Sequence, residues 1–370
     1  MLLSQVTSSH SIQHIANMSI YLDKEIPVGA RHNHAFVPCP KSAVDRTRPK
    51  PELAIGIVNN AQDGALTAME RQFLSILQAS SQGISLRTSL FTLPGIARSD
   101  SARRHIEEHY SDFDSLSSMT LDALIVTGRE PTTPHLHSEP YWKDFAKVVE
   151  WARSCTISTV WSCLAAHAAV LHMDRISRTR QARKCCGVFE CERVTSHSLT
   201  AGLSTHFRIP HSRWNGIEQH RLLEAGYQIL TGADTIGADT FIKHDKSLFL
   251  FFQGHPEYEA DTLMLEYRRD VGRFLRGESA VYPNIPQGYF DTDTVTALKE
   301  IEDNSKGRDR KGASGGLSAV LQEATLKYSW RHTATQIYSN WLHYLAAKKM
   351  PRPYGANLSV DQSSQWGTPQ

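Results

Sequence analysis

The segment STVWSCLAAHAAVLHM, residues 158–173, passes from a β-favouring run to a helix-forming run with no proline or glycine between them. Cys163 stands at this corner. A strand that leads into a helix is the repeating unit of α/β folds, and the unit recurs along the preceding sequence. The alternating strand and helix patterns are LAIGIVNN (53–60), ALTAMERQFLSILQA (65–79), ISLRTSLFTL (84–93), SARRHIEEHYSDF (101–113), LDALIVTG (121–128), YWKDFAKVVEWARS (141–154) and CTISTVW (155–161).

This alternation predicts an α/β fold with a doubly wound, mostly parallel sheet and helices on both faces. After residue 187 the pattern changes to short strands, which are followed by a helix over DTLMLEYRRDVGRFLRG (261–277). In a doubly wound sheet the ligand lies beyond the carboxyl ends of the strands, where the strand order reverses. The strand tails expected at the site are VNNAQDG (58–64), VTGREP (126–131) and WSC (161–163).

Composition divides the chain into four regions. Residues 1–50 lack periodicity and are expected to form a flexible leader, and residues 51–300 form the main domain with the candidate chemistry. Residues 301–325 are expected to form a polar linker or loop, because EDNSKGRDRKGASGG (302–316) is charged and rich in Gly and Ser. Residues 326–349 predict a helix whose apolar face docks on the main domain, and this helix is also a candidate homodimer contact.

The overall charge excludes some classes of partner. The chain has 370 residues, and its 40 basic and 38 acidic residues give a formal charge of +2, which offers no argument for nucleic acid or a membrane surface. We expect a cytoplasmic protein, because no segment resembles a secretion signal or the roughly 20 apolar residues of a membrane span. The six cysteines are then expected as reduced thiols. No metal is expected, since Cys185, Cys186 and Cys191 lack a paired C-x-x-C partner for zinc.

Cys163 has the position of a nucleophile. At the start of a helix, unpaired backbone N–H groups and the positive end of the helix dipole favour the thiolate. The N–H of Leu164, the next residue, is then available to stabilise an oxyanion. The alternative is that Cys163 is a small buried hydrophobic residue, as most free cysteines are.

The segment FFQGHPEY (251–258) offers the groups that such a nucleophile needs. A catalytic cysteine requires a histidine within hydrogen-bonding reach and a third group that orients the histidine. His255 and Glu257 follow an apolar strand two positions apart, so in an extended segment both side chains project to the same side. The alternative is a surface turn that carries a histidine and a glutamate by chance.

Several ordered segments together resemble one known family. They are WSCLAAHAAVLH (161–172), GVFECE (187–192), PHSRWNG (210–216), FFQGHPEYEADTLMLEYRRDVGRFL (251–275) and SWRHTATQIYSNWLHYL (329–345). The chain resembles the homoserine O-succinyltransferase family of methionine biosynthesis over residues 53–290 and 328–345. That family is related in fold to class I glutamine amidotransferases, so the resemblance implies a flavodoxin-like sheet.

The resemblance implies an acyl-CoA:homoserine O-acyltransferase with a ping-pong mechanism and no bound cofactor. Cys163 matches the residue that takes the acyl group from acyl-CoA as a thioester, His255 the general base and Glu257 the residue that orients it. The implied substrates are L-homoserine and either succinyl-CoA or acetyl-CoA. Such a mechanism is chemically coherent, because one histidine can protonate the first leaving group and then deprotonate the next nucleophile.

The resemblance also implies three substrate-binding residues, Lys184, Ser212 and Arg269. Arginine suits the carboxylate of an amino acid, because its guanidinium can donate two parallel hydrogen bonds. Arg268 is adjacent and easily confused with Arg269. For each residue the alternative is a solvated charge or a capping hydroxyl.

The loop after the third predicted strand departs from the family. The family usually has Thr-Gly-Ala where this chain has Thr127, Gly128 and Arg129. The loop is expected to line the acyl pocket and to contribute to the oxyanion site, and Thr132 aligns near the position that separates succinyl from acetyl users. Arg129 could meet a succinyl carboxylate, whereas Glu130 beside it could neutralise the charge. The balance slightly favours succinyl.

Three other functions stay open at this point. A paralogue could acylate a related hydroxy amino acid such as serine, because the long leader and the inserted polar segment are unusual for the family. The same Cys-His-Glu trio could hydrolyse glutamine, although the PHSRW and YRRDV segments would then have no obvious role. A degenerate homologue kept for binding or regulation would not need to retain all three residues of the trio.

Overall fold

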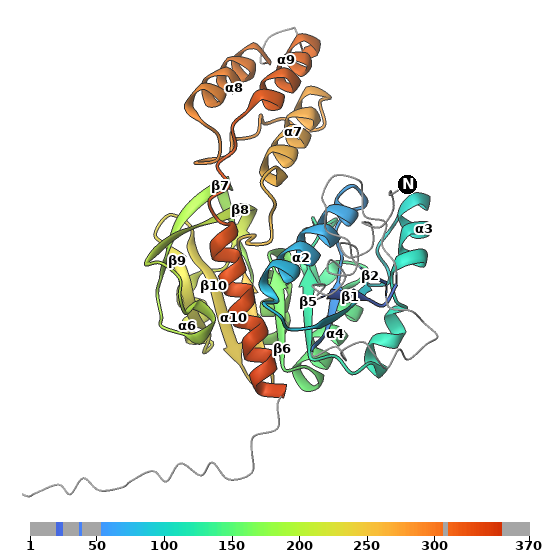
Figure 1. Cartoon of the computed structure of the whole chain (residues 1–370). Coiled ribbons are helices and arrows are strands. Elements are labelled where there is room, and N and C mark those ends of the chain that lie inside the picture. The colour runs from blue at the N-terminus through green and yellow to red at the C-terminus, as the bar shows by residue number, and fades with distance from the viewer. Residues whose placement is uncertain (1–19, 25–36, 39–52, 306–309, 350–370) are drawn as a thin grey trace, which may run out of the picture.

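The computed structural model describes residues 20–24, 37–38, 53–305 and 310–349, which Figure 1 shows as ribbons. The strands are β1 Ile20–Leu22, β2 Val37–Pro38, β3 Leu53–Val58, β4 Leu86–Phe91, β5 Ala123–Thr127, β6 Ser158–Ser162, β7 Thr179–Arg193, β8 His206–Gly216, β9 Gln228–Ala233, β10 Gly237–His244 and β11 Leu248–Phe252. The helices are α2 Leu66–Ser80, α3 Asp100–His109, α4 Trp142–Cys155, α5 Leu164–Asp174, α6 Gln219–Glu224, α7 Thr262–Leu275, α8 Thr292–Ser305, α9 Arg310–Glu323 and α10 Arg331–Lys349.

All these strands join one sheet, in the order β2-β1-β4-β3-β5-β6-β11-β10-β9-β7-β8. The neighbours in the run β4-β3-β5-β6-β11 are paired in parallel. Counted along the chain from β3, this run has the order 2-1-3-4-5, which is the flavodoxin-like order. The predicted doubly wound, mostly parallel sheet is therefore confirmed, and its strand order reverses between β3 and β5.

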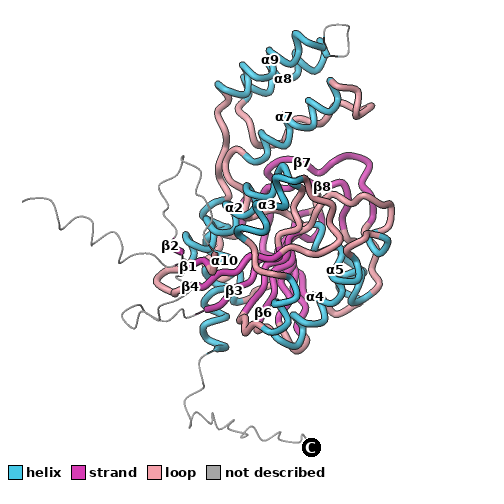
Figure 2. The backbone as a smooth tube through the Cα atoms, turned by 90° about the vertical axis from the view of Figure 1, so that its right-hand side faces the viewer, coloured by secondary structure: helices cyan, strands magenta, loops and turns pink. Residues whose placement is uncertain are grey.

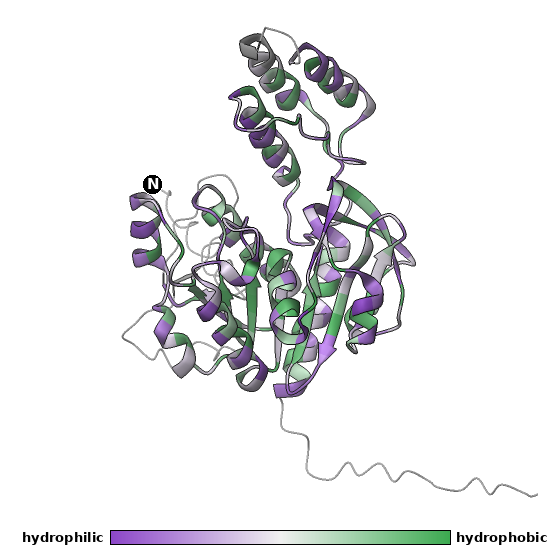
Figure 3. Ribbon diagram, turned by 180° about the vertical axis from the view of Figure 1, so that it is seen from behind, coloured by the Kyte–Doolittle hydropathy of each residue, from purple (hydrophilic) through white to green (hydrophobic). Residues whose placement is uncertain are grey.

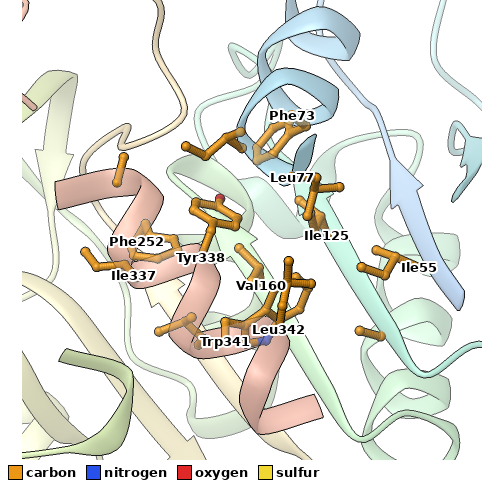
Figure 4. Close-up of a cluster of buried hydrophobic side chains, with 14 of the residues drawn as sticks. Ile55, Phe73, Leu77, Ile125, Val160, Phe252, Ile337, Tyr338, Trp341 and Leu342 are labelled. Carbon is orange, nitrogen blue, oxygen red and sulfur yellow. The ribbon is translucent and has the colours of Figure 1, made fainter. Parts of the chain in front are cut away.

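The central strands are buried on both faces. Ile55 and Ile57 of β3 pack in a hydrophobic cluster with α2 and α10, whereas Ala54 and Val58 pack in a second cluster with α4 and α5. Figure 4 shows the first cluster, in which Phe73 of α2 lies over the sheet. Figure 3 shows hydrophobic strands in the centre and hydrophilic residues on the outer helices. This is why the strands read as continuous apolar runs rather than as alternating patterns.

A helix is present within the segment 326–349, where one was expected to dock. Its residues Ile337, Trp341 and Leu345 are at most 1% exposed, and the Trp341 indole N–H donates a hydrogen bond to Ser158 Oγ at 3.0 Å. Helix α10 therefore packs across the sheet beside α2 (Figure 1).

Beyond β11 the sheet continues with antiparallel neighbours, and the long strands β7 and β8 form its edge. Figures 1 and 2 show α7, α8 and α9 as a helical layer that projects from the end of the molecule where β7 and β8 lie. A third hydrophobic cluster holds this layer to β7 through Cys186 and Val188. The layer matters for function because α7 faces the nucleophile across a cavity described below.

The expectation of a flexible leader is wrong for one short segment. Ile20–Leu22 forms β1, which pairs in parallel with β4, and the side chains of Ile20 and Leu22 are 1% and 2% exposed. Three residues are too short a run for a periodic pattern, so burial against β4 decides their conformation. Most of the remaining residues between 1 and 50 lie outside the described residues.

The expectation of a polar linker over 301–325 is wrong. Helix α8 continues to Ser305, and α9 covers Arg310–Glu323, with residues 306–309 outside the described part. Leu317 and Leu321 of α9, spaced by one helical turn, are buried in the same cluster as Leu298 of α8. Two apolar positions in a Gly-rich segment give a weak pattern, and tertiary packing overrides the local composition.

Membrane-spanning helices and metal-binding clusters are both absent from the described residues. Among these residues no helix is long and apolar enough to cross a membrane. Within the same ranges no group of three or more His, Cys, Asp or Glu side chains is arranged to hold a metal ion. Cys186 and Cys191 are instead buried in β7.

Candidate active site

The strand-to-helix corner holds Cys163 in an unusual backbone conformation. Cys163 is the N-cap of α5, with φ of 50° and ψ of −109°, a region that side-chain-bearing residues rarely adopt. Its N–H donates to the carbonyl of Phe252 at 2.7 Å, and Phe252 pairs with Ser162 in the parallel ladder. The fold thus enforces a strained turn that exposes the thiol at the carboxyl end of the sheet, as expected where a conformation serves a site.

His255 and Glu257 reach Cys163 from the adjacent strand. The Nδ1 atom of His255 lies 2.9 Å from Glu257 Oε1, and the same oxygen accepts a hydrogen bond from Ser162 Oγ at 3.0 Å. Burial lowers the pKa of His255, but the charges of Cys163 and Glu257 and the hydrogen bonds to both raise it well above the ordinary value. These contacts favour the protonated imidazole, which places a proton donor beside the Cys163 side chain.

The His255 ring is also fixed by stacking. Its centroid lies 4.2 Å from that of the Tyr258 ring, with 17° between the planes, and its backbone N–H donates to the Pro210 carbonyl at 2.8 Å. Gly254, which precedes His255, lets the backbone pass close to Asp239, because a Cβ at this position would lie 2.7 Å from Asp239 Oδ1. Backbone and ring contacts thus orient the histidine independently of any substrate.

The thiol opens into a cavity of about 790 Å³, a size typical of small-molecule sites. Seven of the nine site residues expected from the sequence line it, namely Arg129, Cys163, Leu164, Lys184, Ser212, His255 and Arg269. Glu257 lies behind His255 and is fully buried. Thr132 is not part of the lining formed by the described residues.

The loop after β5 packs tightly against the start of α5. A Cβ added to Gly128 would lie 2.5 Å from Leu164 Cβ and 2.7 Å from the backbone nitrogen of Ala165. Only glycine allows this approach, because a methyl group would overlap the helix backbone. Leu164 begins α5, so its N–H has no acceptor within the helix. The Leu164 N–H, next to Cys163 in the chain, is therefore without a partner inside the helix, which is the arrangement that an oxyanion site requires.

Opposite the nucleophile, α7 contributes charged groups that pair with residues of β7. Lys184 Nζ lies 2.9 Å from Asp270 Oδ2, and Arg269 binds Asp270 Oδ1 through Nε at 2.9 Å and Nη2 at 2.8 Å. Burial lowers the pKa of Lys184, but Glu266 and Asp270 outweigh it, so the pKa is raised. Both cations are thus charged and held by one carboxylate.

Glu266, one helical turn before Asp270, organises the polar groups nearest to His255. It accepts a hydrogen bond from Ser212 Oγ and another from the Tyr258 hydroxyl at 2.7 Å. Neither Glu266 nor Asp270 was expected as a site residue from the sequence. The sequence did contain a signal. Glu266 lies three residues before Arg269 and four before Asp270, so both residues are its neighbours on the helix surface.

Thr132 is hydrogen-bonded within its own loop, and its expected part in acyl specificity stays a prediction. Its N–H and hydroxyl donate to the Glu139 carboxylate at 2.7 and 2.9 Å, so its contact with an acyl group would be indirect. Glu130 does not neutralise Arg129, because its carboxylate accepts from Gln62 at 3.2 Å and lies 3.5 Å from Arg273. The Nε atom of Arg129 is buried without a hydrogen-bond partner.

A family model and several relatives match most of the chain in sequence. The family model for homoserine O-succinyltransferase matches residues 22–352. The homoserine O-succinyltransferase of Bradyrhizobium japonicum is 43% identical over 304 residues, which cover 81% of this chain and 92% of that protein. The homoserine O-succinyltransferase of Rhodopseudomonas palustris is 41% identical over 339 residues, which cover 90% of this chain and 100% of that protein.

Solved structures give more distant matches. A glutamine amidotransferase from Methylobacillus flagellatus has a TM-score of 0.44 and 11% identity, and the match covers 79% of this chain and 94% of that one. A glutamine amidotransferase from Thermotoga maritima has a TM-score of 0.40 and 13% identity, with 74% and 99% covered. The sequence matches therefore carry the comparison.

Proposed function

Because the family model and these relatives match most of its length, the chain belongs to the homoserine O-succinyltransferase family, and we propose that it transfers the succinyl group of succinyl-CoA to the side-chain hydroxyl of L-homoserine. The observation that carries the mechanism is the series of contacts from Ser162 through Glu257 and His255 to Cys163. The proposed ester is an activated form of homoserine, as a step of methionine biosynthesis requires.

In the first half-reaction, the Cys163 thiolate attacks the thioester carbonyl of succinyl-CoA. The N–H groups of Leu164 and Gly128 stabilise the oxyanion that forms. When the tetrahedral intermediate collapses, the bond to the CoA sulfur breaks and His255 gives its proton to the departing thiolate. The product is a succinyl thioester on Cys163, beside a neutral His255.

In the second half-reaction, the homoserine hydroxyl attacks this thioester. Neutral His255 removes the hydroxyl proton while the new C–O bond forms, and the collapse of the intermediate releases the Cys163 thiolate. His255 returns to its charged form, which Glu257 stabilises. The histidine thus alternates between acid and base, and the His255–Glu257 distance of 2.9 Å holds its ring for both roles.

The charged groups of α7 and β7 suit the two ends of an amino acid. Arg269 has the planar guanidinium that binds a carboxylate bidentately, and Lys184 lies beside the same Asp270 carboxylate. Glu266 offers an acceptor for the α-ammonium group, close to Ser212. Homoserine would then hold its hydroxyl toward His255, and serine, with one methylene fewer, would not reach as far.

Intact mass spectrometry tests this proposal with the full chain. We expect one succinyl adduct after incubation with succinyl-CoA, and we expect homoserine to remove it and yield O-succinylhomoserine. The Cys155→Ala variant should behave identically, because Cys155 is an exposed cysteine at the end of α4. A wild-type protein that forms no adduct and releases ammonia from glutamine would instead be an amide hydrolase with the same trio.

A further inference from the structure

Two arginines and a tyrosine beside the nucleophile have no task in the mechanism above. Arg129 and Arg178 both line the cavity that contains Cys163. Arg129 and Tyr141 also line a narrow recess whose wall includes Leu164, the residue after the nucleophile. Arg129 therefore borders both spaces, whereas Arg178 lines the cavity and Tyr141 lines the recess.

All three polar groups are available to a ligand. Within the described ranges, no hydrogen bond or ion pair engages the guanidinium of Arg129 or Arg178 or the hydroxyl of Tyr141. Electrostatic interactions join Tyr141 to both arginines and join Arg178 to Cys163. Tyr141 is 7% exposed, and burial chiefly raises its pKa to about 12, so it is a neutral hydrogen-bond donor.

One acidic group beside these side chains is already engaged by its own loop. The acid that interacts with Arg178 and Tyr141 is Glu139, whose oxygens accept four hydrogen bonds from Thr132 and Thr133. Burial raises the pKa of Glu139, but these hydrogen bonds outweigh it and lower the pKa, so the carboxylate is charged. Glu139 thus faces Arg178, whereas the buried Nε atom of Arg129 has no hydrogen-bond partner, so an anionic ligand group would supply the partner that Arg129 lacks.

We propose that Arg129, Tyr141 and Arg178 bind the distal carboxylate of the acyl group and so select a succinyl over an acetyl donor. The proposal rests on the proposed function, since it concerns the acyl group that Cys163 receives. An acetyl group has no charge at this position and would leave a half-buried cation unpaired, which is costly. Thr132 would act in this scheme through Glu139, to which its N–H and hydroxyl donate.

The first test compares two donors that differ only at this carboxylate. Butyryl-CoA carries a methyl group where succinyl-CoA carries the carboxylate, and both share the CoA portion. In Arg178→Met and in Arg129→Met we expect the acylation rate constant kcat/KM for succinyl-CoA to fall by about 10- to 100-fold, the range of a lost charged hydrogen bond. The value for butyryl-CoA should stay the same or rise. Arg178→Lys, which keeps the charge, should lose less.

Arg183→Met is the matched control. Arg183 is an exposed cation that lines the same cavity, so its loss should change both donors by the same factor. If Arg178→Met also lowers both donors equally, the arginine serves the CoA phosphates or the fold, and the proposal is wrong. An unchanged preference for succinyl-CoA in both methionine variants would contradict it too.

A binding experiment separates this proposal from the proposed function. Cys163→Ala cannot be acylated, so calorimetry can measure the dissociation constants of both donors directly. We expect succinyl-CoA to bind at least about 10-fold more tightly than butyryl-CoA, and Arg178→Met in this background to abolish the difference. If these affinities are found but the wild-type protein transfers no succinyl group to homoserine, only the proposed function is refuted. Equal binding of both donors would refute only the carboxylate site.

Discussion

The nucleophile corner and the charged face of α7 lie across one cavity, but different forces hold them in place. In the nucleophile corner, which comprises Ser162, Cys163, His255 and Glu257, the side chains of His255 and Glu257 are 7% and 0% exposed. The charged face, which comprises Glu266, Arg269 and Asp270, is more open, since the side chain of Arg269 is 44% exposed. The corner is fixed by buried backbone geometry, and the charged face by ion pairs among its own groups.

This difference suggests a division of labour. The corner is preorganised before any ligand binds, so its contribution should appear in the chemical steps. On the charged face, Arg269 already binds Asp270, and a substrate carboxylate must join or replace that partner. Changes on the charged face should therefore alter homoserine binding while acylation of Cys163 continues.

The strongest test of the corner removes the thiol. Cys163→Ala should lower kcat for O-succinylhomoserine formation by at least about 10⁴-fold, because no thioester can form. Calorimetry with homoserine should show unchanged affinity, since the charged face stays intact. A variant that lost homoserine binding as well would show that the two regions depend on each other.

The next effect concerns the partner of the histidine. Glu257→Gln should lower kcat by about 10³- to 10⁴-fold, the range found when a neutral amide replaces the acid of a triad. Glu257 raises the pKa of His255, so the amide should lower it. His255 then loses its proton at a lower pH, and the alkaline limb of the acylation rate should shift to lower pH. A profile with an unmoved limb would contradict this role of Glu257.

A substitution on the charged face should have a smaller and different effect. Arg269→Lys keeps the charge but loses the bidentate geometry, so KM for homoserine should rise by about 10- to 100-fold. The burst of Cys163 acylation by succinyl-CoA should stay at the wild-type rate. Arg268→Lys is the matched control, because Arg268 is exposed and lies on the same helix. Equal effects of both substitutions would remove the special role of Arg269.

The residues of the nucleophile corner could be predicted from the sequence because their determinants are local. Cys163 follows a strand and starts a helix, and His255 and Glu257 follow another strand two positions apart. The parallel pairing of β6 with β11, which brings these residues together, is a tertiary feature that the local patterns did not predict. On the charged face, only Arg269 was predicted, and only from the family resemblance. Glu266 and Asp270 were not predicted. Their role depends on how α7 packs over β7, which no local pattern specifies.

Other differences have the same physical origin. The helices α8 and α9 form where composition predicts a linker, because Leu317 and Leu321 are buried among distant residues. Thr132 has the alignment of a specificity residue, yet a short turn directs its hydroxyl to Glu139. Arg178 lies between α5 and β7 in an unremarkable polar stretch, and only the folded chain brings it near Cys163.

The smallest expected effect concerns the outermost hydrogen bond of the corner. Ser162 Oγ donates to Glu257 Oε1 at 3.0 Å, and its loss in Ser162→Ala should cost about 1 kcal/mol, or a few-fold in kcat. Ser158, at the other end of β6, donates to the Leu248 carbonyl at 2.7 Å, far from the thiol. Ser158→Ala should lower the free energy of unfolding by more, about 2 kcal/mol, because it also leaves the buried Trp341 indole N–H without its acceptor, and it should leave kcat unchanged. If both variants lose only stability, Ser162 supports the strand and the active corner begins at Glu257.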